Sequence, residues 1–281
     1  MEIKINDKTL SASLDNENTL GEVLAALEQW ITKSGHRITE LIIDGQVITA
    51  SMIESVFSKN INDVKCIDVH TNVLADLSAA SLINLLEDID SFEKLGFDEK
   101  KKYFDSWIDT PTAMFISVQM PELYSYCVNT FSSGEVSVQT LKTIAEEIQR
   151  EINEPVNEIH KLEKIIKEIC ERLVDLPLDI QTGKDARAAQ TIQVFSAVTE
   201  KLFRIFKQLD SQGFLTGEQD NEKRKEELEQ QFRDFSVVIK DLFEAYEKND
   251  SVLVGDLTEY EASPKLKELY AAISDNIQEK L

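Results

Sequence analysis

The sequence is poor in the residues that interrupt regular structure or cross-link a chain. It contains 9 glycines, 5 prolines and 3 cysteines among 281 residues. So few glycines and prolines argue against an all-β domain with many tight turns, and the abundance of Leu, Ile, Glu, Lys, Gln and Ala favours helices. The three cysteines are widely spaced and form no Cys-x-x-Cys pair. Neither a disulfide framework nor a zinc site of that kind is therefore expected.

The chain also lacks long apolar runs and an excess of basic residues. No apolar stretch approaches the roughly 18 residues of a membrane span, and the opening segment MEIKIND has no signal-peptide pattern. The formal net charge of −22 repels nucleic-acid phosphates and anionic lipid surfaces. We therefore expect a protein of the bacterial cytoplasm whose partner is a protein with a basic surface, or a second copy of the chain, and not nucleic acid or membrane. Alternatively, the acidity serves only solubility.

Strand and helix patterns follow one another in the first 71 residues. The stretches EIKIN and TLSASL alternate polar and apolar residues around a polar turn, which predicts a β-hairpin. In TLGEVLAALEQWI the apolar residues have helical spacing, and RITELIIDGQVI predicts a strand, a turn at Asp44–Gly45 and a short return strand. A last strand is expected near residues 63–71.

This order of elements resembles the β-grasp fold of the ubiquitin-like family. The resemblance covers residues 1–71 and depends on MEIKIN, TLGEVLAALEQWI and LIIDGQVI. It implies that Leu41 and Ile43 face the core, whereas Ile42 and Ile67 are exposed and form an apolar recognition patch. The patch either binds a partner or docks on the rest of the chain. The chain continues through HTNVLADLSAA without a Gly-Gly tail, so it is not a conjugated tag.

Residues 72–281 predict a helical bundle domain, which makes the expected fold class α+β and mainly α. Apolar residues recur in steps of three and four through most of this region, and the longest such pattern spans residues 141–173. Pro121 and Pro155 are expected to bend or break helices near Met120 and Asn153, because proline removes one helical hydrogen bond.

The segment LVDLPLDIQTGKDARAAQTI joins two of the expected helices. A phosphate-binding loop needs several glycines and a Ser or Thr after its Lys, but only Gly183 precedes Lys184, and Asp185 follows. We interpret the segment as a connector in which Pro177 ends the preceding helix. Its polar residues either pack across the end of the bundle or form a second partner-binding site. The residues predicted for that site are Asp179, Gln181, Lys184 and Arg187.

No group of residues has the pattern of a catalytic centre, and we assign no catalytic, cofactor-binding or metal-ligating residue. Cys66 and His70 share a strand face, but two ligands do not make a zinc site. The sequence therefore predicts a non-enzymatic adaptor or scaffold. Two alternatives stay open. One is a chaperone-like factor for secretion or motility (flagellar) proteins, and the other is histidine phosphotransfer through His160, although no glycine follows that residue.

Overall fold

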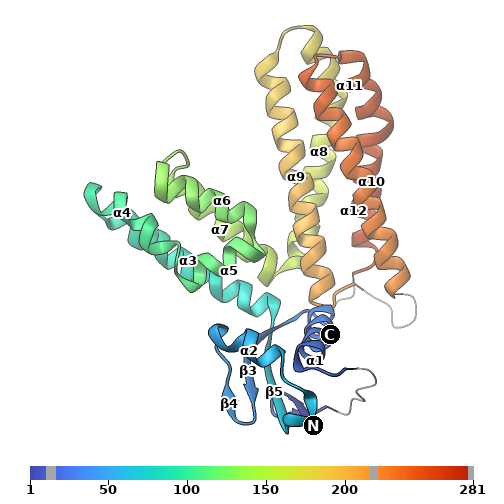
Figure 1. Ribbon diagram of the computed structural model, residues 1–281. Coiled ribbons are helices and arrows are strands. Elements are labelled where there is room, and N and C mark those ends of the chain that lie inside the picture. Colours follow the sequence, from blue (N-terminus) through green and yellow to red (C-terminus); the bar gives the residue numbers. More distant parts are fainter. Residues whose placement is uncertain (11–16, 216–220, 278–281) are drawn as a thin grey trace. The chain divides into compact units, whose positions relative to one another are not determined.

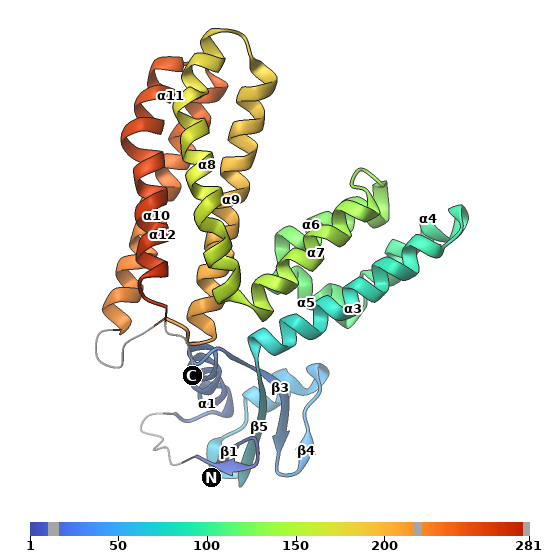
Figure 2. The same ribbon diagram turned by 180° about the vertical axis from the view of Figure 1, so that it is seen from behind.

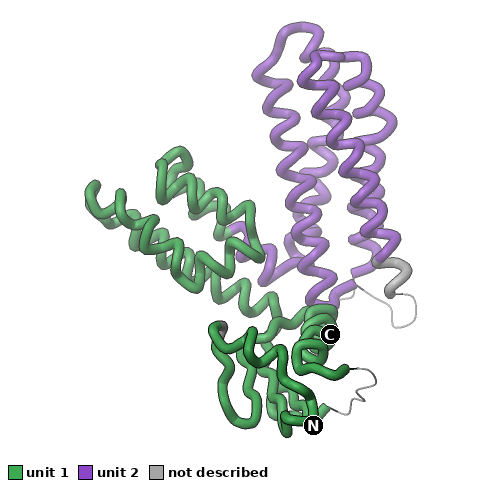
Figure 3. The backbone as a smooth tube through the Cα atoms, in the orientation of Figure 1, with its two compact units in different colours: residues 1–146 green, residues 147–281 purple. Residues whose placement is uncertain are grey.

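The computed structural model describes residues 1–10, 17–215 and 221–277. The chain forms two compact units, residues 1–146 and 147–281, which are coloured separately in Figure 3. A small sheet lies near the N-terminus and helices make up most of the remainder, so the expected fold class is confirmed. Within the described ranges, no helix is both long and apolar enough to cross a bilayer. The domain boundary expected after residue 71 stays a prediction.

The sheet of the first unit has five strands in the order β2-β1-β5-β3-β4. Strands β1 and β5 run parallel, and the other neighbouring pairs are antiparallel; Figure 2 shows β1, β5, β3 and β4 together. The predicted residues 11–16 of the first hairpin lie outside the described residues. The strands are β1 (Glu2–Ile5), β2 (Lys8–Thr9), β3 (His36–Ile43), β4 (Gln46–Val47) and β5 (Cys66–Val73).

Helix α1 (Leu20–Lys33) packs on one face of this sheet. It begins at Thr19, whose side chain accepts a hydrogen bond from the Glu22 N–H, while the Glu22 carboxylate accepts one from the Thr19 N–H. The five apolar residues with helical spacing are all buried: Leu20, Val23, Leu24, Leu27 and Ile31. They share a core with Ile3, Ile43, Ile67 and Val69. Between β4 and β5 lie the short helix α2 (Ile53–Phe57) and two 3-10 turns, Ala50–Met52 and Ile61–Asp63.

The expectation that Ile67 is exposed is wrong. Ile67 is fully buried, because β5 turns Ile67 and Val69 towards α1 and presents Asp68 and His70 on the opposite face. On β3, Ile43 is buried as expected, whereas Leu41 and Ile42 are each half-buried. Ile42 and Ile67 therefore lie on opposite faces of the sheet and cannot form one patch.

Four helices and the beginning of a fifth complete the first unit. Met120 separates α5 from α6, so the expected break before Pro121 is confirmed. Tyr103 and Phe131 surround Phe92, with ring centroids 4.8 to 5.2 Å apart, and Trp107 packs on Phe131. The elements are α3 (Leu74–Lys94), α4 (Phe97–Trp107), α5 (Pro111–Gln119), α6 (Pro121–Val128), a π-helical turn (Asn129–Ser133) and α7 (Val138–Asn153), which continues into the second unit.

The second unit is an antiparallel bundle of long helices, labelled in Figure 1. Its apolar core combines residues of α8, α9, α10, α11 and α12. The helical conformation is interrupted between Asn153 and Pro155, so the interruption predicted from the proline is confirmed. The helices are α8 (Pro155–Gln181), α9 (Asp185–Ser211), α10 (Asn221–Glu247), α11 (Ser251–Leu257) and α12 (Ser263–Ser274), and a π-helical turn (Thr258–Ala262) joins the last two.

The expectation that Pro177 ends its helix is wrong, because α8 continues through Pro177 to Gln181. The proline removes one hydrogen bond of the helix. Its ring packs against Gly255 on α11, where an added Cβ would lie 3.3 Å from the Pro177 Cγ. Helix α8 ends instead after Gln181, and Gly183, whose φ is +68°, allows the Lys184 N–H to donate to the Asp179 carbonyl at 2.9 Å.

Candidate interaction sites

The face of the sheet turned away from α1 carries a mixed polar and apolar row. Strand pairing places Asp68 between Lys4 on β1 and Ile42 on β3, and Ile42 lies opposite Val47 on β4. Ile42 is half-buried and Val47 is 49% exposed. The exposed apolar neighbour of Ile42 is therefore Val47, in place of the predicted Ile67.

Part of strand β3 has no partner strand on the side where β4 lies, and this open edge is next to the row. Strand β4 pairs only with Ile42 and Ile43, and the Ile48 N–H adds one hydrogen bond to the Leu41 carbonyl. Thr39 and Glu40, which precede these residues, are exposed, and no described strand pairs with them on that side. An unpaired strand edge of this kind offers backbone groups to an added strand.

The turn between β3 and β4 is fixed to the start of β5. Asp44 and Gly45 have φ values of +50° and +83°, so the predicted turn is confirmed. The Asp44 carboxylate accepts hydrogen bonds from the N–H groups of Lys65 and Cys66, both at 2.9 Å. The backbone hydrogen bonds from Cys66 and then Lys65 lower the pKa of Asp44, so its carboxylate stays ionised at neutral pH and fixes the β3–β4 turn to the start of β5.

Three potential metal ligands meet on the same face, around Asp68 of this row. The turn after β1 places Asp7 beside Asp68 and His70, and one ligand atom of each lies within 4.8 Å of the others. Sequence reasoning noticed the shared face of Cys66 and His70 but missed Asp7 and Asp68. The alternation along β5 could have indicated Asp68, but Asp7 approaches only because β1 pairs with β5.

The second predicted site lies at the turn between α8 and α9. The structure brings three of its four residues together: Asp179 is 2% exposed, and its carboxylate lies 2.9 Å from the Arg187 Nε and 3.5 Å from the Lys184 Nζ. Gln181 instead donates a hydrogen bond to the Ser251 hydroxyl on α11. Asp179 is too buried to contact a partner, whereas Gln181, Lys184 and Arg187 are exposed. A role of these three in partner binding stays a prediction.

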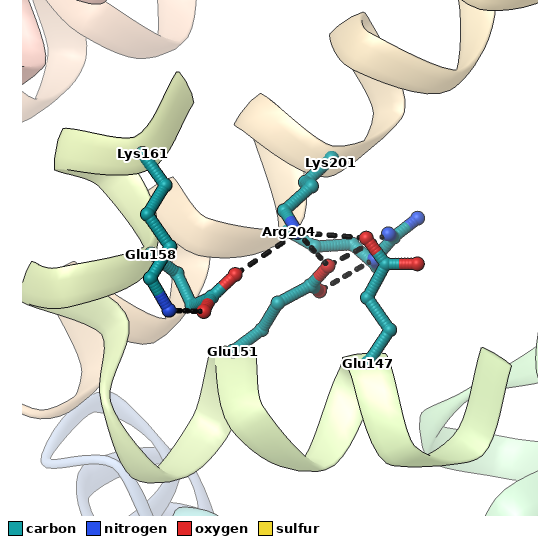
Figure 4. Close-up of polar contacts among 6 residues, drawn as sticks. All are labelled: Glu147, Glu151, Glu158, Lys161, Lys201 and Arg204. Carbon is teal, nitrogen blue, oxygen red and sulfur yellow. Dashed lines mark hydrogen bonds and ion pairs between the residues drawn. The ribbon is translucent and has the colours of Figure 1, made fainter. Parts of the chain in front are cut away.

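A larger cluster of charged side chains joins α7, α8 and α9 within the second unit (Figure 4). Arg204 on α9 donates two hydrogen bonds to the Glu151 carboxylate, at 2.8 and 2.9 Å. The Lys201 Nζ lies 2.7 Å from Glu147 and 3.0 Å from Glu158. Because Glu147 and Glu151 precede the break at Pro155 and Glu158 follows it, the two cations of α9 tie both segments together.

Burial and hydrogen bonding act in opposite directions on the titration of this cluster. Burial would raise the pKa of Glu158, but hydrogen bonds from Lys161 and Lys201 outweigh it and leave the pKa below its ordinary value. For Lys201, burial would lower the pKa, whereas hydrogen bonds to Glu147 and Glu158 raise it overall. Both groups are therefore charged at neutral pH, as the short distances between them require.

Two further titratable side chains bear on possible chemistry. Cys127 is fully buried, and burial, with the nearby Asp88 as a smaller cause, raises the pKa of its thiol to about 12. It is thus a protonated core residue at neutral pH and a weak nucleophile. His160 is exposed on α8. A histidine that serves only packing is usually buried, so this side chain is accessible for other roles.

Two segments of the chain, one near each end, are similar to known protein families. Residues 1–72 match the family described as the TP0873 N-terminal domain, and residues 157–272 match a domain of unknown function, DUF8042. An uncharacterized protein of Treponema pallidum (strain Nichols) is 22% identical over 269 residues, which cover 96% of this chain and 94% of the relative. No solved structure matches. The chain is thus similar to a bacterial protein over nearly its whole length, with a sheet-containing N-terminal domain and a helical C-terminal domain.

Proposed function

We propose that the protein is a non-enzymatic adaptor or scaffold of the bacterial cytoplasm, which binds another protein through the outer face and open edge of its N-terminal sheet. The observation that supports this most is the combination of Ile42 and Val47 with the unpaired edge at Thr39 and Glu40. A partner strand added at this edge would gain backbone hydrogen bonds, and its side chains would contact the apolar pair.

We also propose that residues 1–71 form a β-grasp domain. The parallel pairing of β1 with β5, the position of α1 between β2 and β3, and the antiparallel pairing of β3 with β5 support this assignment. The recognition surface in this proposal consists of Ile42 and Val47, and no longer includes Ile67.

The charged groups of the second unit support a structural role for that unit. Among the described residues, the side chains of Glu151, Glu158 and Asp179 are at most 4% exposed, and each is paired with Lys or Arg. Buried carboxylates held in this way are neutralised by their partners and position helices. The acidity of the chain as a whole favours a partner with a basic surface. The exposed side chains of Gln181, Lys184 and Arg187, at the α8–α9 turn of this second unit, are a second candidate contact.

The adaptor proposal is tested by affinity purification from the native source after cross-linking. Wild-type protein is compared with Ile42→Lys, with Val47→Lys and with the control Val237→Asp, which changes an exposed apolar residue of α10. We expect the wild type and the control to retain the same partner, and both sheet variants to lose it while keeping their circular dichroism spectrum. Absence of any partner with the wild type, or an unchanged partner with Val47→Lys, would contradict the proposal.

A second candidate function is histidine phosphotransfer through His160, which is favoured by one observation, the exposure of this imidazole on a helix of an antiparallel bundle. Phosphorylation of an exposed ring nitrogen would give an acid-labile, alkali-stable phosphate. This candidate predicts such a phosphate on protein purified from the native source, and its loss in His160→Ala. Absence of phosphate in the wild type would remove it.

A further inference from the structure

The N-terminal sheet gathers two carboxylates and one imidazole without a neutralising Lys or Arg among the described ion pairs. The ligand atoms of Asp7, Asp68 and His70 all lie within 4.8 Å of one another. The ion pair formed by Asp68 is a long one with His70, at 3.9 Å. Lys4, which lies beside Asp68 in the strand register, is instead 4.0 Å from Glu2. The three side chains thus present negative charge and a nitrogen ligand to one point.

Asp68 has a polar atom that the protein itself does not satisfy. Its Oδ1 is shielded from solvent and has no hydrogen-bond partner among the described residues, and its side chain is 15% exposed. A carboxylate oxygen that is buried without a partner loses the stabilisation that water would supply. A bound cation would restore that stabilisation.

The backbone around the three side chains is held in place by specific contacts. Asn6 and Asp7 form the turn after β1 with φ values of +49° and +66°. The Asn6 side chain accepts a hydrogen bond from the Thr71 N–H at 2.8 Å and donates to the Thr71 carbonyl and hydroxyl. Because Thr71 directly follows His70, this anchor fixes the turn that carries Asp7 next to the strand that carries the other two ligands.

We propose that Asp7, Asp68 and His70 bind a divalent transition-metal cation. Such a cation takes oxygen and nitrogen ligands at about 2.0–2.2 Å, which places neighbouring ligand atoms roughly 3 to 3.5 Å apart. Rotation of the exposed Asp7 side chain closes the remaining distance. One imidazole with two carboxylates suits Zn²⁺ or Mn²⁺ better than the all-oxygen preference of Mg²⁺ and Ca²⁺. Water would complete the coordination.

The test is calorimetric titration of the full-length chain with ZnCl₂ after treatment with EDTA. We expect one equivalent to bind, and Asp68→Asn and His70→Gln each to weaken binding about tenfold or more. The controls are His36→Gln, another histidine of the same unit, and Cys66→Ser, the thiol on the same face of β5; both are expected to bind like the wild type. Asp→Asn and His→Gln changes preserve size, and circular dichroism checks folding.

A spectroscopic readout does not depend on any variant. The chain has three histidines, His36, His70 and His160, so their ring C–H signals can be assigned individually by NMR. We expect one equivalent of Zn²⁺ to shift the signals of His70 and to leave those of His36 and His160 in place. Binding weaker than millimolar, equal shifts of all three rings, or loss of binding in Cys66→Ser with retention in Asp7→Asn would each overturn the proposed site.

Discussion

The helical bundle and the N-terminal sheet use acidic side chains in opposite ways. In the bundle, the buried carboxylates of Glu151, Glu158 and Asp179 each lie next to a Lys or Arg from another segment. On the sheet, Asp7 and Asp68 lie next to each other and to His70. Opposed charges in the bundle fix helix positions, whereas like charges on the sheet store repulsion that an external cation can relieve. The same residue type therefore serves packing in the bundle and, in our proposal, metal binding on the sheet.

The largest loss of stability is expected when Lys201 is replaced. This side chain contacts Glu147, Glu151 and Glu158. Lys201→Met keeps the aliphatic part of the side chain but leaves the nearly buried Glu158 with Lys161 alone. We expect the free energy of unfolding to fall by about 2 to 3 kcal/mol, since removing one partner of a buried ion pair leaves a charge poorly compensated. Urea unfolding followed by circular dichroism measures this change.

The matched control for this substitution is Lys240→Met. Lys240 pairs with Glu244 at 3.8 Å, and its side chain is 75% exposed. We expect a change within about 0.5 kcal/mol, as for other exposed ion pairs on one helix. If both substitutions had equal costs, the cluster around Lys201 would not differ from a surface ion pair, and the contrast between the two units would fail.

The cost of Lys201→Met is expected to depend on pH. Because the pKa of Glu158 is lowered in the folded protein, its stabilising contribution is present above the ordinary value of 4.5 and is lost as the pH falls through the lower folded value. The raised pKa of Lys201 preserves its contribution up to the ordinary value of 10.5 and above. Urea titrations from pH 7 to pH 3.5 should therefore show the difference between variant and wild type shrinking. A constant difference would assign it to lost packing instead of charge.

A smaller effect is expected at the α8–α9 turn. Arg187→Ala leaves the buried Asp179 carboxylate with Lys184, at 3.5 Å, and removes the contact of Arg187 with Asp175. Because the Arg187 side chain is 48% exposed, we expect a loss of about 1 to 2 kcal/mol, and a smaller loss for Arg187→Lys, which retains the charge. Thermal unfolding of both variants measures this order. Equal stability of Arg187→Ala and wild type would show that this ion pair does not hold the turn.

Local patterns in the sequence are sufficient to predict much of the fold. The helical spacing from Leu20 to Ile31 predicts the buried side of α1, and Pro121 and Pro155 predict two interruptions between helices. These predictions succeed because each depends only on residues a few positions apart. The position of Ile67 was also available locally, since Ile67 and Val69 alternate with Asp68 and His70 along the strand. The resemblance to ubiquitin-like domains implies the opposite orientation for Ile67, and the alternation along β5 is the signal that holds.

Features that depend on distant parts of the chain could not be predicted in the same way. Pro177 remains inside α8 because Gly255, on a helix far along the sequence, provides room for its ring. Asp7 joins Asp68 and His70 only through the pairing of β1 with β5. Asp179, Lys184 and Arg187 lie close in the sequence, but their burial and ion pairs depend on how α8 and α9 pack. The sequence shows that these residues are polar, but their spacing does not tell whether they bind a partner or hold packed helices and strands together.

The smallest expected effect on stability gives the sharpest comparison between the units. Asp68→Asn removes one of two neighbouring negative charges on the sheet, whereas Glu151→Gln removes the charge that holds Arg204. In EDTA, we expect Asp68→Asn to change the free energy of unfolding by no more than about 0.5 kcal/mol, or to raise it slightly, because repulsion is relieved. Glu151→Gln should instead lower it clearly. Urea titration followed through the amide signals of β5 and of α9 reports each unit separately. A large loss in Asp68→Asn without metal would mean that this carboxylate supports the sheet itself, in which case the negative charge on this face would have a structural cause.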